Sequence, residues 1–142
     1  MDPEIPTVSL VDLGVIRTLH SDAEGQITVE LIPTFAGCPA MDWMVAECEL
    51  ALKAVGFAQP VVHLNRTAPW SSDLLTEAGK AGLKKHGLAP PPPAEQGIEV
   101  PSQCPRCDSH NTQLANPFGP TLCRAIHHCN NCHETFEQFK PV

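Results

Sequence analysis

Four cysteines near the C-terminus form two closely spaced pairs. Two residues separate Cys104 from Cys107 and two separate Cys129 from Cys132, with 21 residues (108–128) between the pairs. Each C-x-x-C pair can present two thiolates from a tight turn, and the intervening loop can return the chain so that four sulfur atoms surround one metal ion. The gap slightly exceeds the usual range of about 15 to 20 residues. The spacing predicts a tetrahedral four-cysteine metal site.

Zinc is the metal that we expect there, because two knuckle-like turns around a long loop are typical of a structural zinc ribbon. Four cysteines can also hold iron or an iron-sulfur cluster, and ligand identity alone does not separate these cases. Cys123 lies inside the loop as a fifth cysteine and could be a core residue, a redox partner or an alternative ligand. Histidines flank the last pair, but four thiolates already complete a zinc site.

Cys38, in the first half of the chain, also has a position that could support chemistry. It lies between Gly37 and Pro39, and proline suits the first turn of a helix. We therefore expect Cys38 at or beside an N-cap, where the helix dipole and free backbone N–H groups would lower its pKa and favour the thiolate. The alternative is a packing role, which is common for a lone loop cysteine. Cys48, on the apolar face of the predicted helix, is expected in the core.

Two other segments carry candidate residues. Asp2 and Glu4 crowd a short proline-rich stretch, either as functional carboxylates or as acids that cap a rigid turn. Trp70 follows Pro69 at a predicted junction between a strand and a helix. Its indole would either close the core or present a surface to a partner.

The apolar pattern indicates the elements that must position Cys38. Alternating residues over 26–31 predict a half-buried strand, and a partner strand over 15–20 precedes it across a glycine-containing loop. Apolar residues at three-and-four spacing predict a helix over 41–55 that ends at Gly56.

A third strand is predicted at 61–65, and a last helix from an N-cap at Ser72 or Asp73 to Gly87, although two internal glycines disfavour that helix. A strand that follows a helix can run parallel to one strand of the hairpin. The predicted fold class is therefore α/β in the α+β sense. It is a small two-layer domain with a mixed three-stranded sheet and helices on one face, followed by a zinc-ribbon-like metal module.

A proline-rich segment, 88–103, divides the chain. It contains four consecutive prolines, 90–93, which favour an extended and semi-rigid linker. This leaves 1–87 as a domain with one modest core, and 104–142 as a metal module too small to fold without its ion.

Charge and composition narrow the classes of function. Residues 1–100 carry 6 Lys and Arg against 13 Asp and Glu, so this part holds the whole net charge of -7. An acidic body lacks the basic surface that phosphate groups require, which disfavours a nucleic-acid partner. Seven cysteines in clusters suited to metal, with no signal peptide and no long apolar run, predict a cytoplasmic protein without a membrane partner.

Short motifs give the chain a family resemblance. Asp2-Pro3-Glu4-Ile5-Pro6, Val11-Asp12-Leu13-Gly14 and Gly37-Cys38-Pro39 resemble, in order and spacing, the small iron-sulfur assembly domain of cytosolic iron-sulfur targeting factors. That likeness extends to about residue 87. With Pro69-Trp70 and the two C-terminal cysteine pairs, nearly the whole chain resembles the D proteins of bacterial phenylacetate degradation.

This resemblance implies a maturation factor, not an enzyme, for the phenylacetyl-CoA epoxidase of aerobic phenylacetate catabolism. The implied cargo is transient iron or an iron-sulfur cluster, and the implied partners are the iron-sulfur assembly machinery and the epoxidase subunits, especially the 2Fe-2S reductase subunit. Cys38 is the implied functional cysteine. Asp2, Glu4 and Trp70 are expected as further contacts for cluster transfer or for the client.

Two alternatives stay open: a stoichiometric structural or docking subunit of the epoxidase complex, and a thiol-dependent redox enzyme with Cys38 as its nucleophile. No compact Cys/His/Asp arrangement supports such an enzyme, and the absence of a Glu-x-x-His motif places the di-iron site in another protein. Proteins that this chain resembles usually have a helical segment before Asp2. Without that helix we expect exposed apolar surface and a homo-oligomer.

Overall fold

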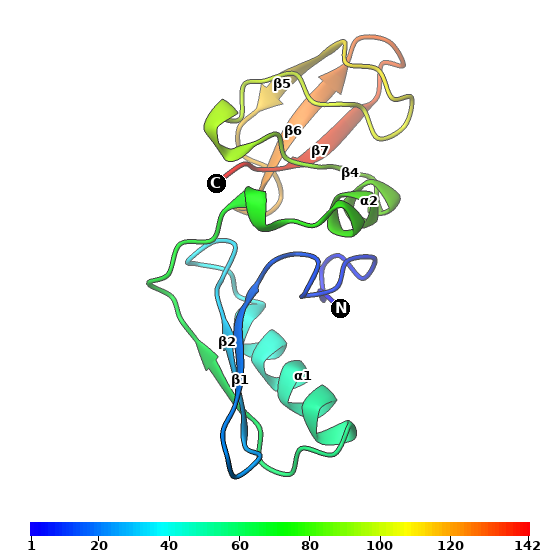
Figure 1. Ribbon diagram of the computed structural model, residues 1–142. Helices are drawn as coiled ribbons and strands as arrows, with labels where there is room; N and C mark the ends of the chain where they lie inside the picture. Colours follow the sequence, from blue (N-terminus) through cyan, green and yellow to red (C-terminus); the bar gives the residue numbers. More distant parts are fainter.

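The computed structural model describes residues 1–142 and contains two separate β-sheets (Figure 1). The first sheet has the order β1-β2-β3, from β1 (Ile16–Ser21), β2 (Ile27–Leu31) and β3 (Val61–Leu64). β1 pairs with β2 in antiparallel register, and β3 runs parallel to β2. The predicted mixed sheet is therefore confirmed, because the helix between β2 and β3 returns the chain for a parallel pairing.

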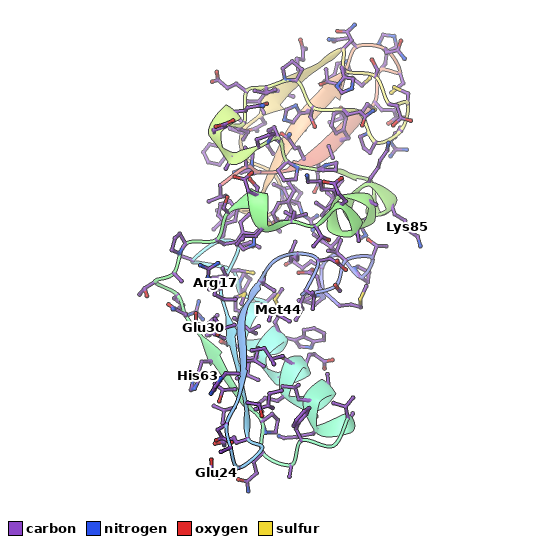
Figure 2. The ribbon with its side chains drawn as sticks, in the orientation of Figure 1. Arg17, Glu24, Glu30, Met44, His63 and Lys85 are labelled. Atoms are coloured by element: carbon purple, nitrogen blue, oxygen red, sulfur yellow. The ribbon has the colours of Figure 1, made fainter.

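One face of this sheet is covered by α1 (Met41–Ala54). Residues in β2 alternate between buried and half-buried positions, and Met44 of α1 packs in the same core as the buried ones. Figure 2 shows Met44 on the α1 side of the sheet, with Glu30 and His63 on the opposite side. The helix ends as predicted, since Gly56 takes a positive φ of 106° just beyond it. No helix has the length and apolar character needed to cross a membrane.

The second sheet has the order β4-β7-β6-β5. Its strands are β4 (Leu88–Ala89), β5 (Thr112–Asn116), β6 (Arg124–Cys129) and β7 (Thr135–Phe139). β4 runs parallel to β7, and the remaining pairs are antiparallel. The segment predicted as a linker thus begins with a strand, because its first two residues are apolar and precede the prolines, which cannot donate to a ladder. We call residues 1–87 the N-terminal part and residues 88–142 the ribbon part.

The second helix begins later than predicted. α2 spans Glu77–His86, and its N-cap is Thr76, whose hydroxyl accepts a hydrogen bond from the first turn. The predicted cap residues, Ser72 and Asp73, lie instead in a short 3-10 turn, η1 (Ser72–Leu74). The predicted start was therefore wrong, since several residues that favour caps occur in succession and only the last one is followed by continuous helix.

Two glycines allow the backbone of the N-terminal segment to approach α2. A Cβ atom on Gly79 would lie 2.4 Å from the carbonyl oxygen of Asp12, and one on Gly82 would lie 2.5 Å from that of Thr7. The Thr7 hydroxyl also donates a hydrogen bond of 2.7 Å to the carbonyl oxygen of Gly82. The glycines that disfavour this helix in the sequence are therefore required by its packing.

A single apolar core joins the N-terminal part to the ribbon part. Leu88 of β4 and Phe139 of β7 belong to the same cluster as the buried residues of the first sheet. The rings of Trp70 and Phe139 meet edge to face, with centroids 5.8 Å apart and an interplanar angle of 66°. The indole N–H of Trp70 donates to the carbonyl oxygen of Leu13 at 3.0 Å. The C-terminal strand of the ribbon is thereby packed against the N-terminal part.

We expect Gly82→Ala to destabilise the protein, although alanine is normally the better helix residue by about 1 kcal/mol. The new methyl group would lie 2.5 Å from the Thr7 oxygen and 2.9 Å from the Val8 side chain. Overpacking of this kind should lower the free energy of unfolding by about 1 to 3 kcal/mol, measured by urea denaturation. Ala81→Ser, at an exposed position of the same helix, is the matched control. Equal or greater stability of Gly82→Ala would contradict the packing argument.

Candidate functional site

Two turns with the same backbone pattern carry the four predicted zinc ligands. The Cys104 N–H donates to the carbonyl oxygen of Ser109 at 2.9 Å, and the Cys104 carbonyl oxygen accepts from the N–H of Asp108 at 3.0 Å. The equivalent two bonds at Cys129 are both 2.9 Å. The residue after each pair, Asp108 or His133, has a positive φ of 59° or 62°. Asp and His are enriched in this left-handed conformation, so the two knuckles are matching turns.

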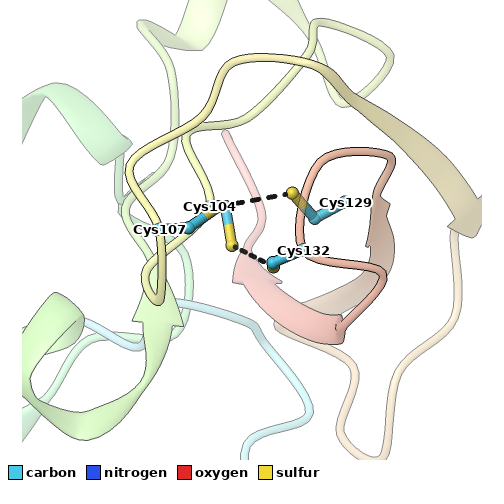
Figure 3. A group of neighbouring side chains, drawn as sticks. All are labelled: Cys104, Cys107, Cys129 and Cys132. Atoms are coloured by element: carbon cyan, nitrogen blue, oxygen red, sulfur yellow. Dashed lines mark hydrogen bonds between the residues drawn. The ribbon is translucent and has the colours of Figure 1, made fainter.

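The four sulfur atoms lie close enough together to bind one metal ion (Figure 3). All four are within 4.8 Å of one another, with Sγ–Sγ distances of 3.8 Å for Cys104 and Cys132 and 3.6 Å for Cys107 and Cys129. A tetrahedral site with Zn–S bonds of about 2.3 Å requires sulfur atoms about 3.8 Å apart. The cluster, which does not include Cys123, therefore has the size and donor set of a structural zinc site.

Two of these thiols have pKa values shifted in opposite directions. The backbone N–H of Ser109 and the side-chain amide of Asn131 lower the pKa of Cys107 to about 6. At Cys132 the backbone N–H of Glu134 lowers the pKa, but burial and hydrogen bonds with the neighbouring thiols raise it to about 12. Protons are thus held unevenly among four crowded sulfur atoms. A zinc ion would displace them, because zinc binds cysteine as the thiolate.

Cys38 does not have the low pKa that its position predicted. α1 has Ala40 as its N-cap, so Cys38 lies two residues before the cap. Burial raises the pKa of the Cys38 thiol, the backbone N–H of Ala40 lowers it in part, and neighbouring acidic groups, Glu4 among them, raise it again. The prediction of an activated thiolate was therefore wrong, because desolvation outweighs the favourable dipoles. The raised pKa favours the protonated thiol of Cys38 over its thiolate.

Cys38 lines a pocket of about 330 Å³ that both parts of the chain form. Its residues from the N-terminal part are Glu4, Thr34, Phe35, Gly37, Cys38 and Pro39. Its other wall is residues 118–123, most of the connection that we call the β5–β6 loop (residues 117–123). The predicted functional cysteine therefore lies in a pocket whose opposite wall belongs to the ribbon part.

Arg124, the first residue of β6, links the β5–β6 loop to the N-terminal part. Its carbonyl oxygen accepts a hydrogen bond of 2.9 Å from the N–H of Gly119, which closes the loop. Its guanidinium lies 3.7 Å from the carboxylate of Glu4 and 3.0 Å from that of Glu137, and its side chain is only 12% exposed. A charge so little hydrated requires its partners, so this ion-pair network favours the docked position of the loop.

The other predicted site residues have separate positions. Asp2 is 5% exposed, and its carboxylate accepts from the backbone N–H groups of Glu4 at 2.8 Å and Ile5 at 2.7 Å. It therefore acts as a turn cap. Glu4 lines the pocket beside Cys38. Trp70 is 3% exposed and packs in the shared core, outside the pocket lining, so its indole is not on a surface that a client could reach.

Cys48 packs partly buried against the core, as its place on the apolar face of α1 predicted. Sequence reasoning left the role of Cys123 open and did not single out Arg124. Cys123 lines the pocket with Cys38, and its sulfur lies 3.1 Å from the hydroxyl of Thr121. No periodicity or spacing marks these residues, because neither encodes which surfaces of two sheets meet.

Two protein families match successive segments of the chain. Residues 1–59 match the family described as iron-sulfur cluster assembly protein, and residues 89–140 match the PaaD zinc beta ribbon domain. The second match contains all four clustered cysteines. The predicted zinc ribbon is therefore confirmed.

Similar proteins extend these two matches. The chain is 34% identical to a 1,2-phenylacetyl-CoA epoxidase subunit of Escherichia coli (strain K12), over 99% of this chain and 86% of that protein. It is 32% identical to an Fe-S protein maturation auxiliary factor of Porphyromonas gingivalis, over 54% of this chain and 72% of that protein. A crystal structure of a DUF59 domain from Bacillus anthracis superposes with a TM-score of 0.53 at 25% identity, over 58% of this chain and 79% of that chain. This likeness confirms the mixed fold of the N-terminal part.

We expect the purified chain to hold one zinc ion and Cys129→Ser to lose it. Removal of one thiolate opens the tetrahedron, and a ribbon of this size needs its metal to fold. Zinc content by elemental analysis and the dispersion of amide NMR signals from residues 104–142 would measure both effects. Cys123→Ser, outside the cluster, is the matched control and should keep its zinc. Full zinc content in Cys129→Ser would contradict the assignment of the ligands.

The raised pKa predicts that Cys38 reacts slowly with iodoacetamide at neutral pH. A pKa above that of a free cysteine lowers the thiolate fraction at every pH below it, and the thiolate is the nucleophile. The zinc-loaded protein would be alkylated across a pH series, and the Cys38 peptide would be quantified by mass spectrometry. The pH at which the alkylation rate is half-maximal should be higher for the folded protein than for the protein unfolded in urea. Glu4→Gln should lower this midpoint pH toward that of the unfolded protein. A lower midpoint pH in the folded protein than in the unfolded protein would contradict the burial argument.

Proposed function

The chain belongs to the PaaD family of 1,2-phenylacetyl-CoA epoxidase subunits, and on this basis we propose that it assists insertion of an iron-sulfur cluster or iron into the phenylacetyl-CoA epoxidase system. The first part of the chain is similar to proteins named Fe-S protein maturation auxiliary factors. In this role the protein acts in the cytoplasm during aerobic phenylacetate catabolism. It binds a client and its cargo and carries out no chemical turnover, so it is not an enzyme.

The observation that carries this proposal is the position of Cys38 in the pocket between the two segments that match the families. A maturation factor needs a thiol that stays inert until metal or a client arrives. The raised pKa of Cys38 favours the thiol form, which oxidises more slowly than the thiolate, while the pocket leaves it accessible to a metal ion. Metal binding would then release the proton, because the thiolate is the form that binds metal.

The cargo is held transiently in this account, because one cysteine offers too few ligands for a cluster. Further ligands come from the client, a second protomer, glutathione or other side chains of this chain. A site with few ligands of its own can release its cargo by ligand exchange. The donor would be the iron-sulfur assembly machinery, and the preferred client is the 2Fe-2S reductase subunit of the epoxidase.

The ribbon part would dock the client next to Cys38. Phe118 and Leu122 lie in the β5–β6 loop at the pocket, and they are 71% and 63% exposed. Two large apolar side chains so near one another on an exposed loop offer contact area to a partner. Docking there would bring a client's cluster site near the sulfur of Cys38.

A second candidate function is that of a stoichiometric docking subunit of the epoxidase complex. It is favoured by the name of the Escherichia coli relative, which is that of an epoxidase subunit. Co-purification with active epoxidase in a fixed ratio would support this role, and epoxidase that stays active after removal of this protein would exclude it. The raised pKa of Cys38 disfavours the thiol-dependent redox enzyme, which needs an activated thiolate.

We expect Cys38→Ser to fail in maturation of the reductase subunit. The subunit would be purified from cells that lack this protein and are complemented with wild type, Cys38→Ser or Cys48→Ser. Cys48 is a matched control because burial raises its pKa too, and it lies on α1 outside the pocket lining. Iron-sulfur content and reductase activity should fall severalfold with Cys38→Ser alone.

This proposal would be contradicted if the reductase subunit held its full iron-sulfur content with each of the three complementing proteins and also in cells that have none of them. The structural role, or a role toward the di-iron subunit, would then have to explain the family relationship.

A further inference from the structure

Two cysteines from opposite parts of the chain line the same pocket. Cys38 comes from the turn before α1, and Cys123 comes from the end of the β5–β6 loop. The carboxylate-bearing Glu4 lines this pocket as well. The pocket thus has three side chains of types that bind metals, and two of them are thiols that take no part in the zinc cluster.

We propose that Cys38 and Cys123 form a transient two-thiolate site for a thiophilic divalent metal ion such as Fe²⁺, with Glu4 as a third donor. This inference rests on the proposed function and deepens it, since it names ligands for the cargo within this chain. It also gives Cys123 a role, which its place between the ribbon cysteines left open.

Charge balance favours a divalent cation in this pocket. Two thiolates beside a carboxylate in a half-buried apolar pocket would repel one another, and a bound cation would relieve this repulsion. A divalent ion neutralises two thiolates. Each S–H group would lose its proton to solvent as its sulfur–metal bond forms, and no atom changes oxidation state. The guanidinium of Arg124 lies 3.7 Å from the Glu4 carboxylate and offsets part of its charge.

The geometry suits temporary binding better than permanent binding. Only the four ribbon cysteines form a metal-binding group with all ligand atoms within 4.8 Å of one another, so Cys38, Cys123 and Glu4 would have to move together to bind an ion. The hydroxyl of Thr121 lies 3.1 Å from the sulfur of Cys123 and helps to fix its direction. A metal bound by three protein donors would keep open positions, through which a client could exchange ligands.

Cobalt(II) is a suitable probe, because its thiolate complexes absorb strongly by charge transfer. We expect the zinc-loaded full chain, under anaerobic and reducing conditions, to bind one further Co²⁺ ion with this absorption. Cys38→Ser and Cys123→Ser should each weaken binding at least about tenfold, since each removes a ligand. Cys48→Ser should bind cobalt like the wild type. Zinc content measured in the same samples shows that cobalt has not replaced zinc.

If Cys123→Ser bound cobalt with the affinity and the charge-transfer absorption of the wild type, the shared site would be overturned. Failure of the wild type to bind a second metal ion would overturn it as well. If Cys123→Ser lost its zinc or its circular dichroism signal, Cys123→Ala would take its place in the titration. Glu4→Gln should retain the charge-transfer band with weaker affinity, because both thiolates remain.

The same variants separate this inference from the proposed function. Normal client maturation by Cys123→Ser, together with failure of Cys38→Ser, would uphold the maturation role and overturn the two-thiolate site. Cobalt binding that needs both cysteines, together with normal maturation by both variants, would uphold the site and overturn the maturation role.

Discussion

The packing of Phe139 against Trp70 is the contact on which the rest of the structure depends. Phe139 ends β7, which begins three residues after the zinc ligand Cys132, so we expect the order of this strand to depend on the metal. Trp70 in turn holds the carbonyl oxygen of Leu13 by a hydrogen bond of 3.0 Å. Lys140, the residue after Phe139, donates its backbone N–H to the carbonyl oxygen of Cys123 at 2.9 Å, so a zinc ion that orders β7 would also stabilise the β5–β6 loop over Cys38.

The cysteines of this chain lie in two electrostatic environments. In the zinc cluster, the backbone N–H groups of Ser109 and Glu134 favour the thiolate forms of Cys107 and Cys132, which suits sulfur atoms that share one zinc ion. Cys38 lies half-buried beside Glu4, and its pKa is raised by burial. The first environment favours a permanent ion. The second favours the protonated thiol until a cation compensates the charge, which is a useful property for a site that receives a metal and passes it on.

Features that depend on local sequence could be predicted: the hairpin, α1, the parallel β3 and the cysteine cluster each follow from periodicity or spacing. Features that depend on contacts between residues far apart in the chain could not be predicted from the sequence. Gly82 disfavoured a helix in the sequence, and only the Thr7 backbone packed against it explains its presence. The low pKa expected for Cys38 failed for the same reason, since its desolvation comes partly from residues far away in the sequence. Cys123 and Arg124 belong to the pocket only because the two sheets pack together.

Hydrogen–deuterium exchange of the full chain, with zinc bound and after its removal by a chelator, tests most directly whether the ribbon part completes the pocket. Loss of zinc should raise exchange in residues 104–142 and also in residues 34–40 around Cys38, while the middle of α1 stays protected by its own core. Unchanged exchange in residues 34–40 after the ribbon unfolds would contradict this account, because the Cys38 pocket would then be a property of the N-terminal part alone.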